Sequence, residues 1–157
     1  MSKITTFLSY GNNQAEEAAR LYVSIFEDKG SRITNVTPGP DGKAMVISFE
    51  LFGQPYTALN VPATPDFAFT NGVSLMITCE NQEEVDRYWE RLAANGGKEV
   101  ACGWVKDKFG LPWQVVPRAM MEMLSDKDKE KSGRAFQAMT KMVKLDIATL
   151  KKAFDGG

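Results

Sequence analysis

The sequence predicts an α+β fold built from two tandem βαβββ modules, on the strength of two internal repeats. A turn followed by a strand, Phe52-Gly53-Gln54-Pro55-Tyr56, recurs as Phe109-Gly110-Leu111-Pro112-Trp113. A helical motif that begins at Glu16-Glu17 recurs at Glu83-Glu84, each time after an Asn-Gln pair. Repetition of one supersecondary pattern indicates a duplicated architecture.

The helices and strands are placed by periodicity. Apolar side chains recur every three or four residues in both helical motifs, and Asn13 and Asn81 are the expected N-caps. We expect the strands to form a curved, mostly antiparallel mixed sheet. Strands are expected at 4–8, 32–37, 44–52 and 56–61 in the first half, and at 73–79, 99–105, 106–109 and 113–116 in the second.

The domain organisation follows from these elements. We expect a single domain with a first module at 1–61, a linker at 62–72, a second module at 73–117 and a helical extension at 118–157. Asp126 and Asp146 are the expected caps of the later helices in the extension. Five of the eight methionines lie there, and we favour a helix-packing role for them over a lid on a ligand.

Composition excludes several classes of protein. The chain has 157 residues, 43% hydrophobic and 25% charged, with a net charge of −1. Neither nucleic acid nor an anionic membrane is therefore an expected partner. No apolar run reaches the roughly 20 residues of a membrane span, and no signal peptide is evident, so a cytoplasmic location is expected. Cys79 and Cys102 are expected to be reduced thiols.

Histidine is absent from the sequence, which removes the usual general base near neutral pH. Glu50 and Asp107 each precede the repeated turn, and Lys106 is adjacent to the second of them. They are weak candidates for acid–base catalysis, because exposed turn carboxylates commonly only bind water. No nucleophile has a visible base partner, so the catalytic residues and the question of enzymatic activity stay open.

One segment resembles a known family. The residues Cys102-Gly103-Trp104-Val105-Lys106-Asp107-Lys108-Phe109-Gly110-Leu111-Pro112-Trp113-Gln114-Val115-Val116-Pro117 are similar to the hallmark of the PhnB-like family. That family, often labelled 3-demethylubiquinone-9 3-methyltransferase, belongs to the vicinal oxygen chelate superfamily with glyoxalase I and the bleomycin- and fosfomycin-resistance proteins. The resemblance is expected to span the chain, C-terminal helices included, and it implies a homodimer.

The superfamily usually binds a divalent metal through His in the first strand of a module and Glu in the last. The resemblance matches these positions to Thr6 or Phe7, to Ser74 and to Gln114. Because hydroxyl, aromatic and amide groups are poor ligands for transition metals, we expect no metal and no cofactor. The methyltransferase label is disfavoured too, since no Gly-rich turn of the kind that admits S-adenosylmethionine is present.

The resemblance places Gln114 on the concave face of the sheet. By the repeat, Thr57 and Leu59 then face the first cavity. Strand alternation puts Ser74 and Met76 on one side of their strand, and Phe7 and Trp104 are the nearby aromatic side chains. The predicted ligand-binding residues are Phe7, Thr57, Leu59, Ser74, Met76, Trp104 and Gln114. An alternative is that Gln114, Ser74 and Thr57 only hydrogen-bond to one another inside a filled barrel. Trp89 and Trp113 are expected in the core.

Three functions are compatible with the sequence. The favoured one is a metal-free protein that binds a small apolar or aromatic molecule in the concave face of the sheet, as bleomycin-resistance proteins do by sequestration. The second is a metal-independent enzyme that uses Glu50, Asp107 or Lys106. The third, disfavoured, is the methyltransferase of the family label.

Overall fold

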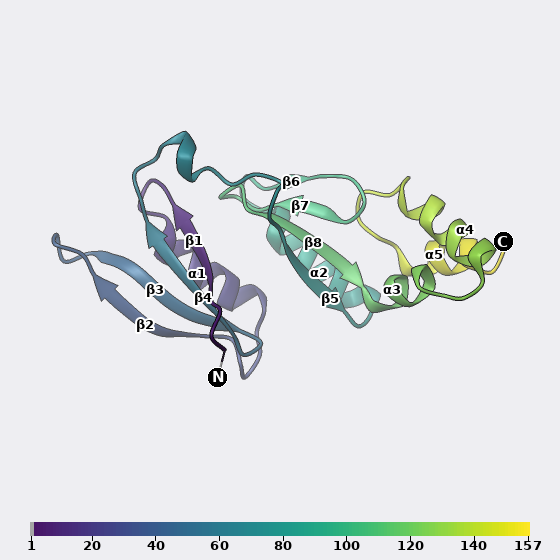
Figure 1. The fold of residues 1–157 in the computed structure, drawn as a ribbon, viewed down its shortest axis with the longest axis horizontal. Coiled ribbons are helices and arrows are strands. Elements are labelled where there is room, and N and C mark those ends of the chain that lie inside the picture. The colour runs from purple at the N-terminus through teal and green to yellow at the C-terminus, as the bar shows by residue number, and fades with distance from the viewer. Residues whose placement is uncertain (1) are drawn as a thin grey trace. The chain divides into compact units, whose positions relative to one another are not determined.

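The computed structural model describes residues 2–157, and the chain divides into two units, one up to Ala68 and one from Phe69 to Gly157. Each unit contains one βαβββ module with its own four-stranded mixed sheet (Figure 1). The predicted fold class is confirmed. The strands form two separate sheets, one in each unit, and a set of helices follows the second.

The first unit contains five elements and a short 3-10 turn, η1 (Pro65–Phe67). They are β1 (Thr6–Tyr10), α1 (Ala15–Ile25), β2 (Arg32–Pro38), β3 (Ala44–Leu51) and β4 (Gln54–Asn60). The sheet order is β1-β4-β3-β2, with β1 parallel to β4 and the other pairs antiparallel. The repeated turn, Phe52-Gly53, has positive φ at both residues, as a two-residue hairpin requires.

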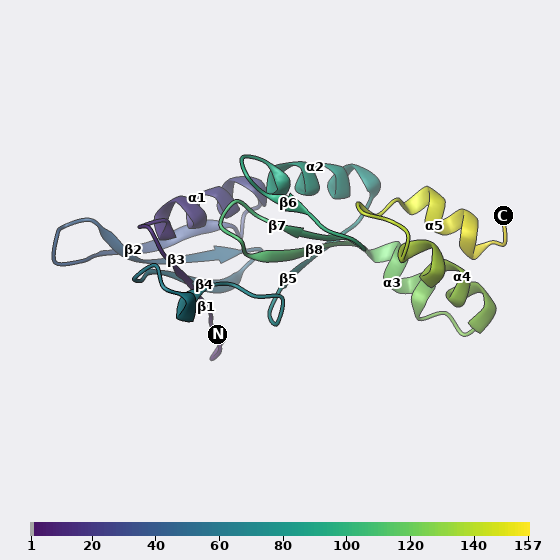
Figure 2. The same ribbon diagram turned by 90° about the horizontal axis from the view of Figure 1, so that it is seen from above.

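Helix α1 covers one face of this sheet (Figure 2). Its buried side Ala15, Ala18, Ala19, Tyr22 and Ile25 packs over strand residues that include Ile47 and Phe49. The expectation that Asn13 caps this helix is wrong. The amide of Ala15 instead donates to Oδ1 of Asn60, 2.9 Å away on β4, so the cap comes from the sheet.

The second unit repeats this plan with β5 (Leu75–Cys79), α2 (Gln82–Ala93), β6 (Lys98–Glu99), β7 (Trp104–Lys106) and β8 (Pro112–Pro117). Its sheet order is β5-β8-β7-β6, and α2 covers one face. Asn81 caps α2 as predicted, accepting from the Glu84 amide at 2.9 Å. Trp89 and Trp113 are buried between helix and sheet, as expected.

The strands expected at 99–105 and 106–109 are wrong in their boundaries. A turn at residues 101–103 separates β6 from β7, because Cys102 and Gly103 have φ of 60° and 84° and so cannot continue a strand. A second turn, Asp107–Leu111, separates β7 from β8. The first turn was not predicted, because Cys102 and Gly103 lie between apolar residues that favour a strand.

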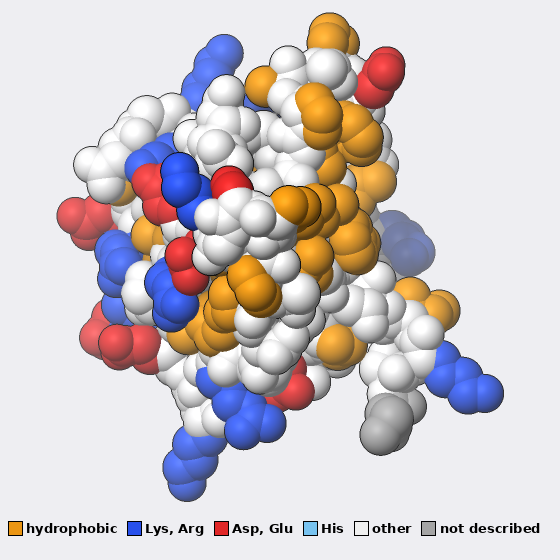
Figure 3. Space-filling view, turned by 90° about the vertical axis from the view of Figure 1, so that its left-hand side faces the viewer, with side chains coloured by type: hydrophobic (Ala, Val, Ile, Leu, Met, Phe, Trp, Pro, Cys, Tyr) orange, Lys and Arg blue, Asp and Glu red, His pale blue; other side chains and the backbone are white. Residues whose placement is uncertain are grey.

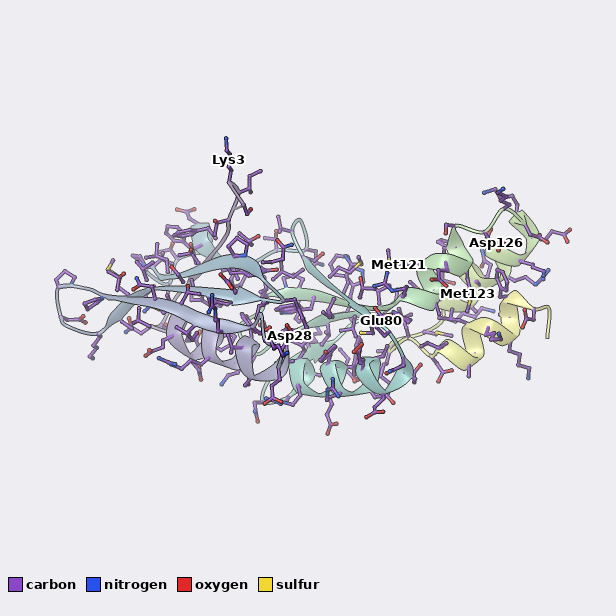
Figure 4. The ribbon with its side chains drawn as sticks, turned by 90° about the horizontal axis from the view of Figure 1, so that it is seen from below. Lys3, Asp28, Glu80, Met121, Met123 and Asp126 are labelled. Atoms are coloured by element: carbon purple, nitrogen blue, oxygen red, sulfur yellow. The ribbon has the colours of Figure 1, made fainter. Side chains whose placement is uncertain are left out.

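The extension forms three helices, α3 (Arg118–Leu124), α4 (Lys129–Met139) and α5 (Ile147–Phe154). Asp146 caps α5 as predicted, but α4 is capped by Asp128 and not by Asp126. Met120 packs in a core with Val116, Leu145 and Leu150. Met121 is exposed whereas Met123 packs against that core, so the two lie on different sides of α3 (Figure 4). Among the described residues, no helix has the length and apolar character to cross a bilayer.

Polar contacts attach the extension to the second sheet and its helix. Arg118 donates to both carboxylate oxygens of Glu80, which lies beside the start of α3 (Figure 4). The side chain of Gln82, the first residue of α2, is hydrogen-bonded to the start of α5. It donates to the carbonyl of Leu145 at 3.0 Å and accepts from the amide of Ile147 at 2.8 Å. The Arg118 partnership lowers the pKa of the exposed Glu80 carboxyl.

Leu145 is the apolar member of this attachment, being fully buried and packed at Gly103. Leu145→Ala should therefore lower the free energy of unfolding by about 3 kcal/mol, the usual cost of a large cavity. Urea denaturation followed by circular dichroism measures it. The exposed neighbour Val143 provides the control, because Val143→Ala should change stability by less than about 0.5 kcal/mol. Equal effects from the two variants would contradict the role given to Leu145.

Candidate functional site

Each sheet has one face that its own helix leaves uncovered, here called the open face. In the first unit the β1–β4–β3 register aligns Phe7, Thr57 and Ser48 across this face. Leu59 lies two residues further along β4, on the same side as Thr57. Phe7 is 57% exposed, and hydrophobic side chains are visible between charged ones on the molecular surface in Figure 3. The three predicted residues of this unit therefore share one face.

In the second unit the corresponding row, here called the site row, is Met76, Gln114 and Trp104. Nε2 of Gln114 donates to Oγ of Ser74 at 2.9 Å, which brings together all four ligand-binding residues predicted in this unit. The register also settles the first-strand position. Phe7 is opposite Thr57, and Met76 is opposite Gln114, so Phe7 and Met76 are equivalent.

A cavity of about 340 Å³ adjoins the site row at Trp104. It is lined by Asn71, Val100, Ala101, Cys102, Trp104, Val105 and Lys106. Of the predicted residues it contains Trp104 and the weak catalytic candidate Lys106, but not Ser74, Met76 or Gln114. The remaining lining residues were not predicted to belong to a site, because the turn after Val100 was predicted as strand. The Cys-Gly pair inside an apolar run was the one signal for that turn.

The wall of the cavity at Cys102 is fixed by the extension. The amides of Cys102 and Gly103 donate to the carbonyls of Met142 and Val143, both at 2.8 Å, and the Gly103 carbonyl accepts from Val115. A Cβ at Gly103 would lie 2.7 Å from Cδ1 of Leu145. Only glycine fits this close approach with a positive φ.

Asp107 departs from the expected exposed turn carboxylate, because it is only 2% exposed. Its Oδ1 accepts from the amides of Phe109 and Leu111 at 2.9 and 3.1 Å, and its Oδ2 accepts from Nε1 of Trp113 at 3.0 Å. The carboxylate thus ties the turn to a core tryptophan. These contacts give Asp107 a structural role in place of the predicted solvent-exposed one.

The register also changes the equivalence between the modules. Glu50 is opposite Pro55 in the first sheet, whereas Lys106 is opposite Pro112 in the second. Glu50 therefore corresponds to Lys106 and not to Asp107, because the second turn is one residue longer. Glu50 lies 3.5 Å from Nε of Arg32 on the neighbouring strand.

The two cysteines lie in different surroundings. Cys79 is fully buried, and burial raises the pKa of its thiol to about 12, with the Glu84 carboxylate adding to the shift. It therefore stays protonated and unreactive at neutral pH. Cys102 is half-buried and lines the cavity.

The register puts Met76, and not the expected Ser74, at the position equivalent to Phe7, and the side chains at the positions expected to match metal ligands do not fit a transition metal. The open faces present an aromatic ring and a hydroxyl at Phe7 and Thr57, and a thioether and an amide at Met76 and Gln114. These donors are weak or absent. Among residues 2–157, no group of three or more Cys, Asp or Glu side chains is arranged to hold a metal ion.

Comparison with known proteins decides the family. Residues 2–116 match the model of the family described as 3-demethylubiquinone-9 3-methyltransferase. The chain belongs to this family. Its match ends at residue 116, so the extension lies outside it, contrary to the expectation that the resemblance included the C-terminal helices. None of the curated proteins compared matches the chain.

Solved structures support the assignment. The chain is similar to a putative 3-demethylubiquinone-9 3-methyltransferase, the PhnB protein, from Bacillus cereus, with 31% identity over 74% of this chain and 99% of that chain and a TM-score of 0.66. The resemblance to the PhnB-like family is confirmed. Protein PA1353 from Pseudomonas aeruginosa shares the fold, with 21% identity, coverages of 74% and 98%, and a TM-score of 0.62.

We predict that Asp107→Asn lowers the free energy of unfolding by about 2 kcal/mol, because the new amide turns a donor toward existing N–H donors. In a Trp113→Phe background the destabilisation caused by Asp107→Asn should be smaller by about 1 kcal/mol, since Phe lacks the indole N–H. Denaturation of the four proteins in this double-mutant cycle measures the coupling. Glu50→Gln at the other turn is the control and should be near neutral. Strict additivity would show that the Asp107–Trp113 bond does not contribute.

Native protein at pH 7.5 should react with iodoacetamide at Cys102 only. The pKa of about 12 keeps Cys79 protonated, and burial excludes the reagent. Intact mass and peptide mapping should show one adduct in buffer and two in denaturant. Cys102→Ala should remove the native adduct. Labelling of Cys79 in the folded protein at the rate seen in denaturant would refute the buried position.

Proposed function

We propose that this protein binds a small apolar or aromatic molecule on the open face of the second unit, without a metal. The observation that carries the proposal is the cavity of about 340 Å³ beside Trp104. Its lining is mainly apolar, with Val100 and Ala101 accompanying Trp104, and it also includes the polar residues Asn71 and Lys106. That combination is the usual make-up of a small-ligand site.

The site row extends the surface available to a ligand. Met76 is 49% exposed and offers a flexible thioether, and Gln114 holds its amide in place through Ser74. A polarizable side chain beside an aromatic wall suits flat or irregular apolar molecules. We propose that the bound molecule contacts Trp104 and reaches along the row toward Met76.

A metal-independent enzyme is a second candidate because Lys106 lines the same cavity as Cys102. Asp107 contributes less to that candidate, since its oxygens are engaged with the turn and Trp113. The family description would imply methyl transfer. Both sheets here are mixed, with a single parallel pair each, which differs from the parallel sheet and Gly-rich turn of the common S-adenosylmethionine site.

The homodimer and the cytoplasmic location also stand as proposals that rest on the family and on composition. In the first unit Phe7, Met45 and Phe52 are exposed apolar side chains that a second copy would cover.

Binding is tested with N-phenyl-1-naphthylamine, a neutral aromatic dye whose fluorescence rises in apolar surroundings. Wild-type protein should bind it saturably, and Trp104→Ala should weaken binding about tenfold through lost apolar contact. Phe136→Ala removes an exposed aromatic from α4 and should leave the affinity unchanged. Equal affinities for wild type and Trp104→Ala would refute the cavity as the site.

S-adenosylmethionine separates the family description from the proposal. In a thermal-shift titration it should not raise the midpoint of unfolding. A saturable rise that depends on concentration would favour the methyltransferase reading over the binding protein.

A further inference from the structure

The open face of the second unit carries two positive charges directly opposite each other. Lys98 on β6 pairs with Lys106 on β7 in the antiparallel register. Side chains at opposite positions have Cβ atoms about 5 Å apart, and like charges there are unfavourable. An arrangement of this kind is stabilised by an anion between or beside the two ammonium groups.

The equivalent place in the first unit shows what a balanced version looks like. There Arg32 is opposite Glu50, and the two form an ion pair at 3.5 Å. Lys98 replaces Arg32 and Lys106 replaces Glu50, so a neutral pair in the first module has become a doubly positive one. Within this pair, the charge differs between the modules at one position, which is Glu50 in the first and Lys106 in the second.

Acidic groups near the lysine pair point elsewhere. Glu99 is opposite the buried Val105, and its carboxylate accepts from Nε1 of Trp89 on the helix side. Asp107 is buried in the turn and bonded to Trp113. Within the described part of the chain, no ion pair joins a carboxylate to Lys98 or Lys106.

The lysine pair adjoins the apolar cavity. Trp104 and Lys106 are two residues apart on β7 and point to the same side, and both line the cavity together with Asn71. An occupant of this site meets an indole and aliphatic side chains at one end and an ammonium group at the other. The chemistry that satisfies both ends is an apolar body carrying an anionic group.

We propose that the ligand is an organic anion, an aromatic or aliphatic body with a carboxylate or sulfonate group, whose charge pairs with Lys106 and is reinforced by Lys98. The inference rests on the proposed function and names the class of ligand. The apolar body lies against Trp104. Lys106 contacts the anion directly, and Lys98 raises the local positive potential.

A matched pair of dyes tests the charge. 1-Anilinonaphthalene-8-sulfonate carries a sulfonate that N-phenyl-1-naphthylamine lacks, while the ring systems are the same. Wild type should bind the anionic dye about tenfold more tightly than the neutral one, as a charged hydrogen bond implies. Raising sodium chloride from about 0.02 to 0.5 M should weaken only the anionic dye, because salt screens exposed charges.

Variants locate the effect. Lys106→Met should abolish the preference for the anionic dye and leave the neutral dye within about twofold, whereas Lys106→Arg should retain the preference. Lys98→Met should reduce the preference for the anionic dye less than Lys106→Met does. Lys106→Glu recreates the charge pattern of the first module, so it should remove anion binding and raise the midpoint of thermal unfolding. Lys151→Met removes one charge from α5 and should change neither affinity.

The outcomes separate the two proposals. If Trp104→Ala weakens both dyes but no lysine variant changes their ratio, the anion inference is overturned and the apolar binding site stands. If Lys106→Met changes the ratio but Trp104→Ala has no effect, the anion site stands and the proposed cavity fails. If neither substitution has an effect, both proposals are overturned.

Discussion

The buried carboxylate of Asp107 is the interaction on which the second module depends. It gathers two turn amides and the indole N–H of Trp113, and so joins the turn, the strand after it and the helix-facing core. A buried charge is costly unless hydrogen bonds surround it, and here the donors are supplied by the residues whose positions it fixes. The β7–β8 register follows from that turn. This register aligns Trp104 with Gln114 and places Lys106 opposite Pro112.

The duplication could be predicted from sequence because each repeated motif combines local signals. Gly in a turn, Pro at a strand start and apolar residues at helical spacing all agree with the final fold. The Cys102-Gly103 turn escaped prediction because its cause is not local. Its amides are satisfied by the carbonyls of Met142 and Val143, about forty residues away in sequence. The burial of Asp107 escaped for the same kind of reason, since its third donor is the side chain of Trp113 in the next strand. Within the site row, Gln114 followed from the family resemblance, Met76 from strand alternation, and Trp104 from its being a nearby aromatic. The cavity could not be predicted, because it depends on the Cys102-Gly103 turn.

The extension therefore contributes to the site even though the family match ends at residue 116. Leu145 contacts the space that a side chain at Gly103 would need, and two backbone hydrogen bonds hold the adjacent residues. A turn with Cys102 in the left-handed region stores strain unless its surroundings fix it. Those surroundings are supplied here by residues outside the matched family segment. The wall of the cavity is thus shaped by a part of the chain that the family model does not describe.

Comparison of the two modules separates what the fold requires from what the site requires. Positions that face the helices stay apolar in both, as Phe49 and Val105 show, because each helix needs a partner surface. Positions on the open faces differ in chemistry although the backbone register is the same. Thr57 becomes Gln114, Ser48 becomes Trp104 and Glu50 becomes Lys106. The change from an Arg32–Glu50 pair to Lys98–Lys106 makes the second sheet less favourable on its own. The first module forms the same strand pairing with an ion pair, so the pairing itself does not require two opposed cations. This is the reason for assigning the two lysines to ligand binding.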